Sequence, residues 1–162
     1  MKMKVRRFKP EDSKSASKIM IEAFRSFIGE RLSQLDLKSF SSQVLRKTSN
    51  TKRDNSETVS YVVEEDGRIL GYIQGSATTR GLGSLNVVGV DPKFFHKGIG
   101  TALMRKMEEF WKRKKQRKVS TCVSAHNTRA LVYYLKNRFI PVGYQKEHFM
   151  VGVDEIVLDR FL

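Results

Sequence analysis

Apolar residues recur every three or four positions near the start of the chain, a spacing typical of a helix with one buried face. The members of this face are Ala16, Ile19, Met20, Ala23, Phe24 and Phe27. Pro10 and Asp12 or Ser13 signal the turn that leads into the helix, and Gly29 marks its expected end. A short edge strand is expected before it, over residues 4–8.

The pattern weakens after this first helix. Leu37, Phe40 and Val44 support a second, less regular helix that follows Asp36. Residues 48–58 are almost wholly polar, a composition that predicts a mobile surface loop.

The apolar period changes to two from residue 59 onward, which predicts strands. Residues 59–63 and 69–78 form the two arms of a hairpin, joined by the turn residues 65–68. The next apolar run, residues 84–90, is expected to be a central strand. Gly89 interrupts it and indicates either a bulge or the close approach of a ligand.

Helical spacing returns over residues 99–110 and is followed by a strand over residues 119–123. Another helix starts near Asn127, continues to Phe139 and is stopped by Pro141. Two closing strands follow, over residues 142–149 and 151–161. This order of elements predicts an α+β fold built on one mixed sheet.

Length and composition limit the architecture. A chain of 162 residues fits a single domain, residues 1–162, and 40% hydrophobic residues suffice for a packed core. The longest apolar stretches are too short to cross a bilayer, and no apolar block follows the basic start, so neither a membrane partner nor export is expected. The single cysteine, Cys122, forms no internal disulfide, so a cytoplasmic location is expected.

The formal charge of +14 has two interpretations. Clustered cations attract polyanions, so nucleic acid or a phosphate-rich cofactor would explain the excess. A solvated, solubilising surface explains it equally well. The densest basic run, residues 111–118, lies at an expected helix C-terminus, where cations complement the helix dipole and need no nucleic acid.

A glycine pair opens the helix that follows the central strand. The first N–H groups of a helix lack internal partners and lie at the positive end of its dipole, so a pyrophosphate can bind several of them. Gly98 and Gly100 allow close approach to the backbone, and Lys97 adds charge. A dinucleotide fingerprint would require glycine where Leu103 stands, and no Gly-Lys-Ser or Gly-Lys-Thr of a P-loop follows.

Residues 88–103 closely resemble the coenzyme A motif of the GNAT N-acetyltransferases. A second signature of that family, Asn127-x-x-Ala130-x-x-x-Tyr134, follows at the expected distance, and residues 5–12 are similar to the family's first strand and turn. The resemblance therefore covers nearly the whole chain. It implies the acyl-CoA N-acyltransferase fold, a mixed, mostly antiparallel sheet of about seven strands flanked by about four helices. It also implies direct transfer of the acetyl group of acetyl-CoA to an amine.

The resemblance assigns site residues as well. It implies that the coenzyme contacts Val88, Gly89, Val90, Phe95, His96, Lys97, Gly98, Ile99, Gly100, Thr101 and Asn127. In the family the tyrosine of the second signature, here Tyr134, is the acid that protonates the coenzyme A thiolate. Its neighbour Tyr133 is a rival, although only Tyr134 shares a helix face with Asn127 and Ala130.

This sequence departs from the family pattern at three positions. Phe95 replaces the usual Gln or Arg, His96 replaces a glycine, and Arg138 stands where a glycine precedes Phe139. Because phosphate contacts in this family come mostly from backbone N–H groups, these changes are expected to modify the site without abolishing it.

No general base is evident. Relatives often carry a glutamate at the positions of Cys122 or Ser84, and neither is a carboxylate here. His126, Glu64 and Glu65 remain candidates. Cys122 would be a nucleophile only if it were exposed and activated, which a mid-strand cysteine seldom is. His96, His126 and His148 are too scattered to suggest a metal, so none is predicted.

The acceptor also stays open between a small-molecule amine and a protein or peptide amine. Two functions without catalysis are alternatives, namely nucleic-acid binding through the basic surface and sensing of coenzyme A. A homodimer is left open.

Overall fold

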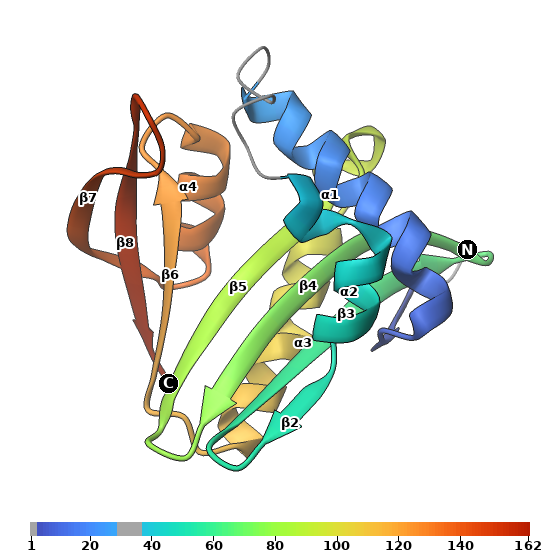
Figure 1. Cartoon of the computed structure of the whole chain (residues 1–162), viewed down its shortest axis with the longest axis horizontal. Helices are drawn as coiled ribbons and strands as arrows, with labels where there is room; N and C mark the ends of the chain where they lie inside the picture. The colour runs from blue at the N-terminus through green and yellow to red at the C-terminus, as the bar shows by residue number, and fades with distance from the viewer. Residues whose placement is uncertain (1–2, 29–36) are drawn as a thin grey trace.

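The computed structural model describes residues 3–28 and 37–162, and within them eight strands form one sheet in the order β1-β3-β4-β5-β6-β8-β7, with β2 beside β3 (Figure 1). The strands are β1 (Lys4–Arg7), β2 (Thr51–Arg53), β3 (Ser56–Glu65), β4 (Arg68–Thr78), β5 (Leu82–Val90), β6 (Lys118–Ser124), β7 (Ile140–Met150) and β8 (Val153–Phe161). Among the described pairs only β5 and β6 run parallel. The predicted mixed, mostly antiparallel α+β fold is confirmed.

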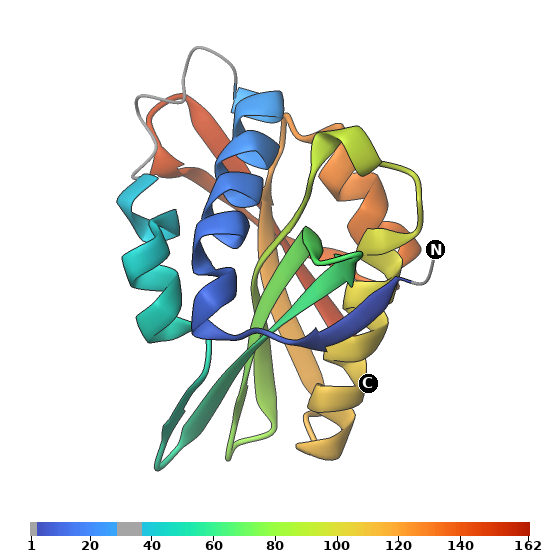
Figure 2. The same ribbon diagram turned by 90° about the vertical axis from the view of Figure 1, so that its right-hand side faces the viewer.

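The four described α-helices cover both faces of the sheet. They are α1 (Ser13–Ile28), α2 (Ser42–Thr48), α3 (Ile99–Arg113) and α4 (Thr128–Lys136). Figure 2 shows α1 and α2 on one side of the strands and α3 and α4 on the other. Each side has its own apolar core, the first around Met20 and Tyr72 and the second around Leu103 and Trp111. None of the described helices is long and apolar enough to cross a membrane.

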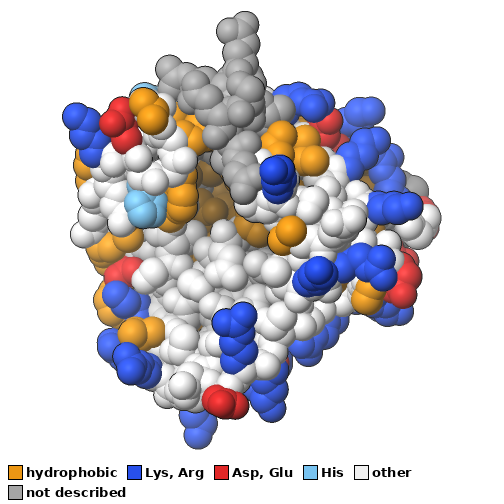
Figure 3. Space-filling model, in the orientation of Figure 1, with side chains coloured by type: hydrophobic (Ala, Val, Ile, Leu, Met, Phe, Trp, Pro, Cys, Tyr) orange, Lys and Arg blue, Asp and Glu red, His pale blue; other side chains and the backbone are white. Residues whose placement is uncertain are grey.

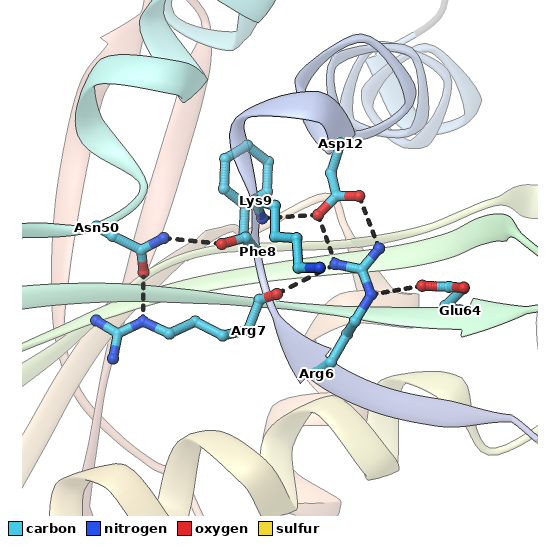
Figure 4. Close-up of polar contacts among 7 residues, drawn as sticks. All are labelled: Arg6, Arg7, Phe8, Lys9, Asp12, Asn50 and Glu64. Atoms are coloured by element: carbon cyan, nitrogen blue, oxygen red, sulfur yellow. Dashed lines mark hydrogen bonds and ion pairs between the residues drawn. The ribbon is translucent and has the colours of Figure 1, made fainter.

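Polar contacts fix the start of α1 against the sheet (Figure 4). The Arg6 guanidinium donates two hydrogen bonds to the Asp12 carboxylate, at 2.7 and 2.8 Å, and a third to Glu64 on β3. Asp12 also accepts the backbone N–H of Lys9 at 2.7 Å. The turn predicted from Pro10 and Asp12 is therefore a short 3₁₀ helix held by an ion pair. The end predicted for α1, Gly29, lies outside the described residues.

Two predictions about the segment before β3 were only partly right. The second helix is shorter and later than its apolar pattern suggested, because Leu37–Phe40 forms a 3₁₀ turn and α2 begins after the Ser41 cap. The predicted loop over residues 48–58 contains β2 and the start of β3. Residues of β2 show no alternation of apolar and polar side chains, because this outer strand is exposed on both faces and polar residues suit it.

Of the two reasons predicted for Gly89, the bulge is wrong. The β4–β5 register shifts at Gln74 and Gly75, opposite Asn86, so the bulge lies elsewhere. A Cβ on Gly89 would lie 2.6 Å from the Met20 sulfur. Glycine therefore suits the close packing of α1 on β5, and the predicted close approach of a ligand at this position stays a prediction.

The end of α4 was also predicted too late. The helix stops at Lys136, and Arg138 adopts a left-handed φ of 65° before Phe139 enters the core. Pro141 lies inside β7 and does not end the helix. Proline has no backbone N–H to donate, and an outermost strand such as β7 tolerates this because one of its edges has no partner strand.

Candidate active site

A cleft opens where β5 and β6 separate. These strands pair only over Leu82 with Lys118, Gly83 with Val119, and Ser84 with Ser120. Just beyond the last pair, the Thr121 hydroxyl donates a 3.0 Å hydrogen bond to the Leu85 carbonyl. The strands then diverge (Figure 1), and a cleft of about 1370 Å³ lies between them.

The open face of this cleft is visible in Figure 3 as a hollow between the β7–β8 side and the α1 side, with hydrophobic side chains around it. The residues of β5 past Ser84 have no β6 partner among the described pairs. Apart from the Leu85 carbonyl, which accepts the Thr121 hydroxyl, their backbone groups on that side are therefore available to a ligand with an extended polar chain, as at a sheet edge.

A tight turn directs the N-terminus of α3 into the cleft. The Asp91 carboxylate accepts the N–H of Lys93 at 3.0 Å and starts a 3₁₀ turn. His96 and Gly98 then adopt left-handed φ values of 62° and 77°. A Cβ on Gly98 would meet nothing within 4 Å, so the space in front of the helix is open. The unpaired N–H groups of the first turn form a site suited to an anion.

Gly100 serves packing between the two helices of this side. A Cβ there would lie 3.0 Å from the Tyr133 ring, and the Tyr133 hydroxyl donates a 2.7 Å hydrogen bond to the Gly100 carbonyl. Tyr133 therefore holds α4 against the first turn of α3. Burial raises the pKa of Tyr133, so this donor keeps its proton.

Tyr134 is buried at the cleft wall. Its ring packs edge-on against Phe139, with 5.6 Å between ring centres, and only 7% of the residue is exposed. Burial raises the pKa of Tyr134 to about 12, although a hydrogen bond with the Thr121 side chain opposes the shift. The hydroxyl therefore carries its proton across the neutral range. The helix bearing it is capped by Asn127, whose side chain accepts the Ala130 N–H at 3.1 Å.

The structure brings most of the sequence-predicted site residues to this one cleft. Those that line it are Val88, Gly89, Val90, Phe95, His96, Gly98, Ile99, Gly100, Thr101, Asn127 and Tyr134. Lys97 is exposed and is not among the described lining residues; its ammonium lies 4.9 Å from the centre of the Phe94 ring. Phe95, at the unusual position, instead lies under the guanidinium of Arg129 at 4.7 Å.

Comparison with known proteins places the chain in a family. The model of the acetyltransferase (GNAT) family matches residues 29–139, more than half of the chain. The chain belongs to the GNAT acetyltransferase family. Acetyl-CoA is the acetyl donor of this family.

An uncharacterized N-acetyltransferase of Methanocaldococcus jannaschii is 28% identical over 107 residues, which cover 62% of this chain and 44% of that protein. This GNAT chain thus spans less than half of that relative. PaiA N-acetyltransferase from Thermoplasma acidophilum, solved with coenzyme A, superposes with a TM-score of 0.83 at 16% identity, and Ard1 from Thermoplasma volcanium with 0.81 at 19%. The first pair covers 100% of both chains and the second 100% and 99%. At these identities the likeness establishes the fold.

The general-base candidates named from the sequence lie away from the cleft, at its rim, or in it. Glu64 pairs with Arg6, and neither Glu64 nor Glu65 is among the described cleft residues. His126 is exposed at the rim. Cys122 lines the cleft, but burial and the nearby charge of Glu155 raise the pKa of its thiol, which keeps it neutral.

Glu155 is a cleft residue that the sequence analysis missed. It lies on β8, is only 6% exposed, and is the one acidic side chain among the described residues that line the cleft. Within residues 3–28 and 37–162 its carboxylate makes no hydrogen bond or ion pair. A signal was present, because Val153, Glu155 and Val157 alternate along the strand and place the carboxylate on one face with two valines.

Proposed function

We propose that this GNAT protein transfers the acetyl group of acetyl-CoA directly to an amine, with Tyr134 protonating the departing sulfur. The observation that carries the proposal is the convergence of three features on one cleft. These are the unpaired edge of β5, the open N-terminus of α3 and the buried Tyr134 hydroxyl.

The residues of the cleft fit acetyl-CoA. The N–H groups at the start of α3 suit its pyrophosphate, and the absence of any atom in front of Gly98 leaves room for it. The free edge of β5 suits the amide-bearing pantetheine arm, which can bond to it as an added strand would. Arg129 and Lys136, which also line the cleft, add positive charge for the phosphates. When bound, the coenzyme supplies a thioester whose carbonyl carbon is the acetyl donor.

Tyr134 is the better of the two tyrosines for the acid. The Tyr133 hydroxyl is committed to the Gly100 carbonyl, whereas Tyr134 lies at the cleft wall and retains its proton at neutral pH. As negative charge develops on sulfur, a positioned hydroxyl can donate to it and lower the barrier.

The pair of tyrosines provides the test. Tyr134→Phe should lower turnover about 100-fold while leaving coenzyme A binding nearly intact, since only the acid is removed. Turnover is measured as thiol release from acetyl-CoA in the presence of an amine panel, and binding by calorimetry. Tyr133→Phe is the matched control, and it should affect stability more than turnover. Full activity of Tyr134→Phe would contradict the assigned role, and no transfer by the unaltered protein to any amine would contradict the function.

The ion pairs of the basic surface weaken the case for binding of nucleic acid. Three lysines of the densest cationic region are already in ion pairs, Lys112 with Glu108, Lys114 with Glu57 and Lys118 with Asp159. Their charge is partly neutralised and solvated, so a polyanionic partner is not needed to explain them. We further infer a cytoplasmic location from the single, half-buried Cys122, which has no cysteine partner in the sequence.

A further inference from the structure

Glu155 lies on the face of the sheet opposite to the coenzyme helices. Opposed residues of paired strands share a face, and Val119, Val123 and Leu158 belong to the core beneath α3 and α4. The alternate residues of β6 and β8 therefore point the other way. These are Ser120, Cys122 and Ser124 on β6, with Asp159, Val157 and Glu155 opposite them on β8.

This second face continues that of α1 and α2. Ser84 of β5 is aligned with Ser120 of β6 in the parallel pair, so both side chains lie on the same face. Glu155 is opposite Ser124, at the far end of β6, where β5 has already diverged. The carboxylate thus borders the cleft from the α1–α2 face, whereas Asn127 and Tyr134 border it from the α3–α4 face.

The state of this carboxylate is unusual for a structural residue. A buried acid normally has a cationic or hydrogen-bonding partner, because desolvation of an unpaired charge is costly. Glu155 is 6% exposed and has no such partner within the described residues. Asp159, four positions later on the same face of β8 and equally buried, accepts hydrogen bonds from Lys118 and Ser120. The strand therefore satisfies one acid and leaves the other facing the cleft.

From this geometry we propose that Glu155 binds the ammonium group of the acceptor and takes its proton, and that the acceptor is a primary amine on an apolar body. The inference rests on the proposed acetyl transfer. It names a general base on β8 for that reaction.

The proton balance is complete with residues on the two walls. The ammonium gives one proton to the Glu155 carboxylate, and the nitrogen lone pair attacks the thioester carbon. The carbon–nitrogen bond forms, the carbon–sulfur bond breaks, and sulfur takes the Tyr134 proton. The second proton of the nitrogen returns to the Tyr134 oxygen, and Glu155 releases its proton to solvent. The products are an acetamide, free coenzyme A and one proton.

The surroundings of Glu155 suit this role. Burial raises its pKa to about 7, close to the pH at which it would exchange protons. The titratable groups that interact with it are Cys122 on β6 and Tyr134 on α4, both neutral at that pH, and its opposite residue on β7 is Gln145. The ammonium would therefore meet no competing cation at the carboxylate.

The lining of the α1–α2 side defines the substrate class. Phe24 and Phe40 stack with 4.8 Å between ring centres, and Met150 and Val153 lie beside the β8 end. A monoamine with an apolar skeleton can bury its body here. The further cations of a polyamine would find no second acid among the described lining residues and would meet the same charge on Arg129 and Lys136.

The experiment compares Glu155→Gln with Glu109→Gln in the full chain. Glu109 is exposed and pairs only with Lys106 in the described structure, so it controls for the loss of one carboxylate. Thiol release from acetyl-CoA is followed with phenethylamine, spermidine and an alanine-initiated peptide from pH 5.5 to 9. Since glutamine matches glutamate in shape, the variant should fold, and circular dichroism verifies this.

We expect Glu155→Gln to lower kcat/KM for the preferred amine about 100-fold at pH 7 and to remove the limb that rises through about pH 7 in the unaltered protein. The KM for acetyl-CoA and the activity of Glu109→Gln should change less than threefold. Phenethylamine should be acetylated at least tenfold faster than spermidine at equal concentration.

Three results would overturn parts of this scheme and are distinguishable. An active protein whose Glu155→Gln variant keeps its rate and pH profile rejects Glu155 as the base and leaves the proposed function standing. A preference for spermidine rejects the substrate class. Failure of the unaltered protein to acetylate any of the three amines rejects the proposed function together with this inference.

Discussion

Asp12 and Glu155 are buried to nearly the same extent, with 7% and 6% of each residue exposed, yet they are in opposite electrostatic states. Burial alone would raise the pKa of Asp12, but hydrogen bonds from Arg6 and from the Lys9 N–H outweigh it and hold the pKa below its usual value. Glu155 has burial without compensation, and its pKa rises. At similar burial, the partners of an acid therefore decide in which direction its pKa moves.

The two regions differ in where each carboxylate points. Asp12 joins β1, the turn before α1 and, through Arg6, β3, so its charge is used entirely within the fold. Glu155 faces the cleft, where under the proposed scheme a fold-stabilising partner would occupy the place of the acceptor amine. Functional sites commonly retain such locally unfavourable groups.

The largest effect that would break this comparison concerns Asp12. Asp12→Ala should lower the free energy of unfolding by about 3 kcal/mol, because it leaves the Arg6 guanidinium without its bidentate partner. Urea unfolding measures the change, and Glu155→Gln serves as the contrasting variant, expected to be neutral or stabilising at pH 8. Equal destabilisation by both would show that the two acids play the same structural role.

The pH dependence of stability should separate the two acids by sign. Asp12 has a lowered pKa, so its contribution is present above its ordinary 3.8 and is lost as the pH falls through the lower folded value. Glu155 has a raised pKa, so stability is greatest below its ordinary 4.5 and decreases as the pH rises through about 7. The second loss should be about 2 kcal/mol, since water in the cleft screens part of the charge.

Unfolding curves collected between pH 3 and 8 for the unaltered protein and for Glu155→Gln test this sign. Subtraction of the two should leave a decline between about pH 4.5 and 7 that belongs to Glu155 alone. A flat difference would mean that the carboxylate ionises as freely in the folded protein as in the unfolded chain.

The smallest expected effect concerns an ion pair nearer the surface, which shows how exposure weakens a pair compared with that of Asp12. Glu57 pairs with Lys114, whose side chain is 39% exposed, and the hydrogen bond lowers the pKa of Glu57. Glu57→Gln should cost about 0.5 kcal/mol, because exposed pairs are screened by solvent. Thermal unfolding at low and high salt measures it, and the difference should shrink with salt. A loss of stability as large as that for Asp12→Ala would contradict the expectation that exposure weakens this pair.

Local patterns in the sequence were sufficient for most of the fold. The three-to-four spacing of α1 and α3 and the alternation of β3 and β4 come from burial on one side of each element, and such periodicity is readable without contacts. The same holds for the glycine-bearing turn before α3, because its helix start and left-handed residue are local properties. The family motifs led directly to Tyr134 and Asn127, which the structure places on one cleft.

The errors lie where distant residues decide the conformation. Gly89 packs closely against Met20, almost seventy positions earlier, and β2 exists because β3 provides its hydrogen-bonding partner. By contrast, His96 and Arg138 occupy left-handed positions that favour glycine, in agreement with the family pattern, which has glycine at both positions.

The sequence by itself determined the order of helices and strands, the turn that opens α3 and the family to which the chain is similar, because these depend on spacing and residue type along the chain. Tertiary structure alone decided that β5 and β6 pair over only three residues, that Tyr133 is bound to Gly100 while Tyr134 borders the cleft, and that Glu155 is buried there without a partner. The physical reason is that charge states and cleft walls depend on contacts between residues far apart in the sequence. Here those contacts are between β8 and β6 and between α4 and α3.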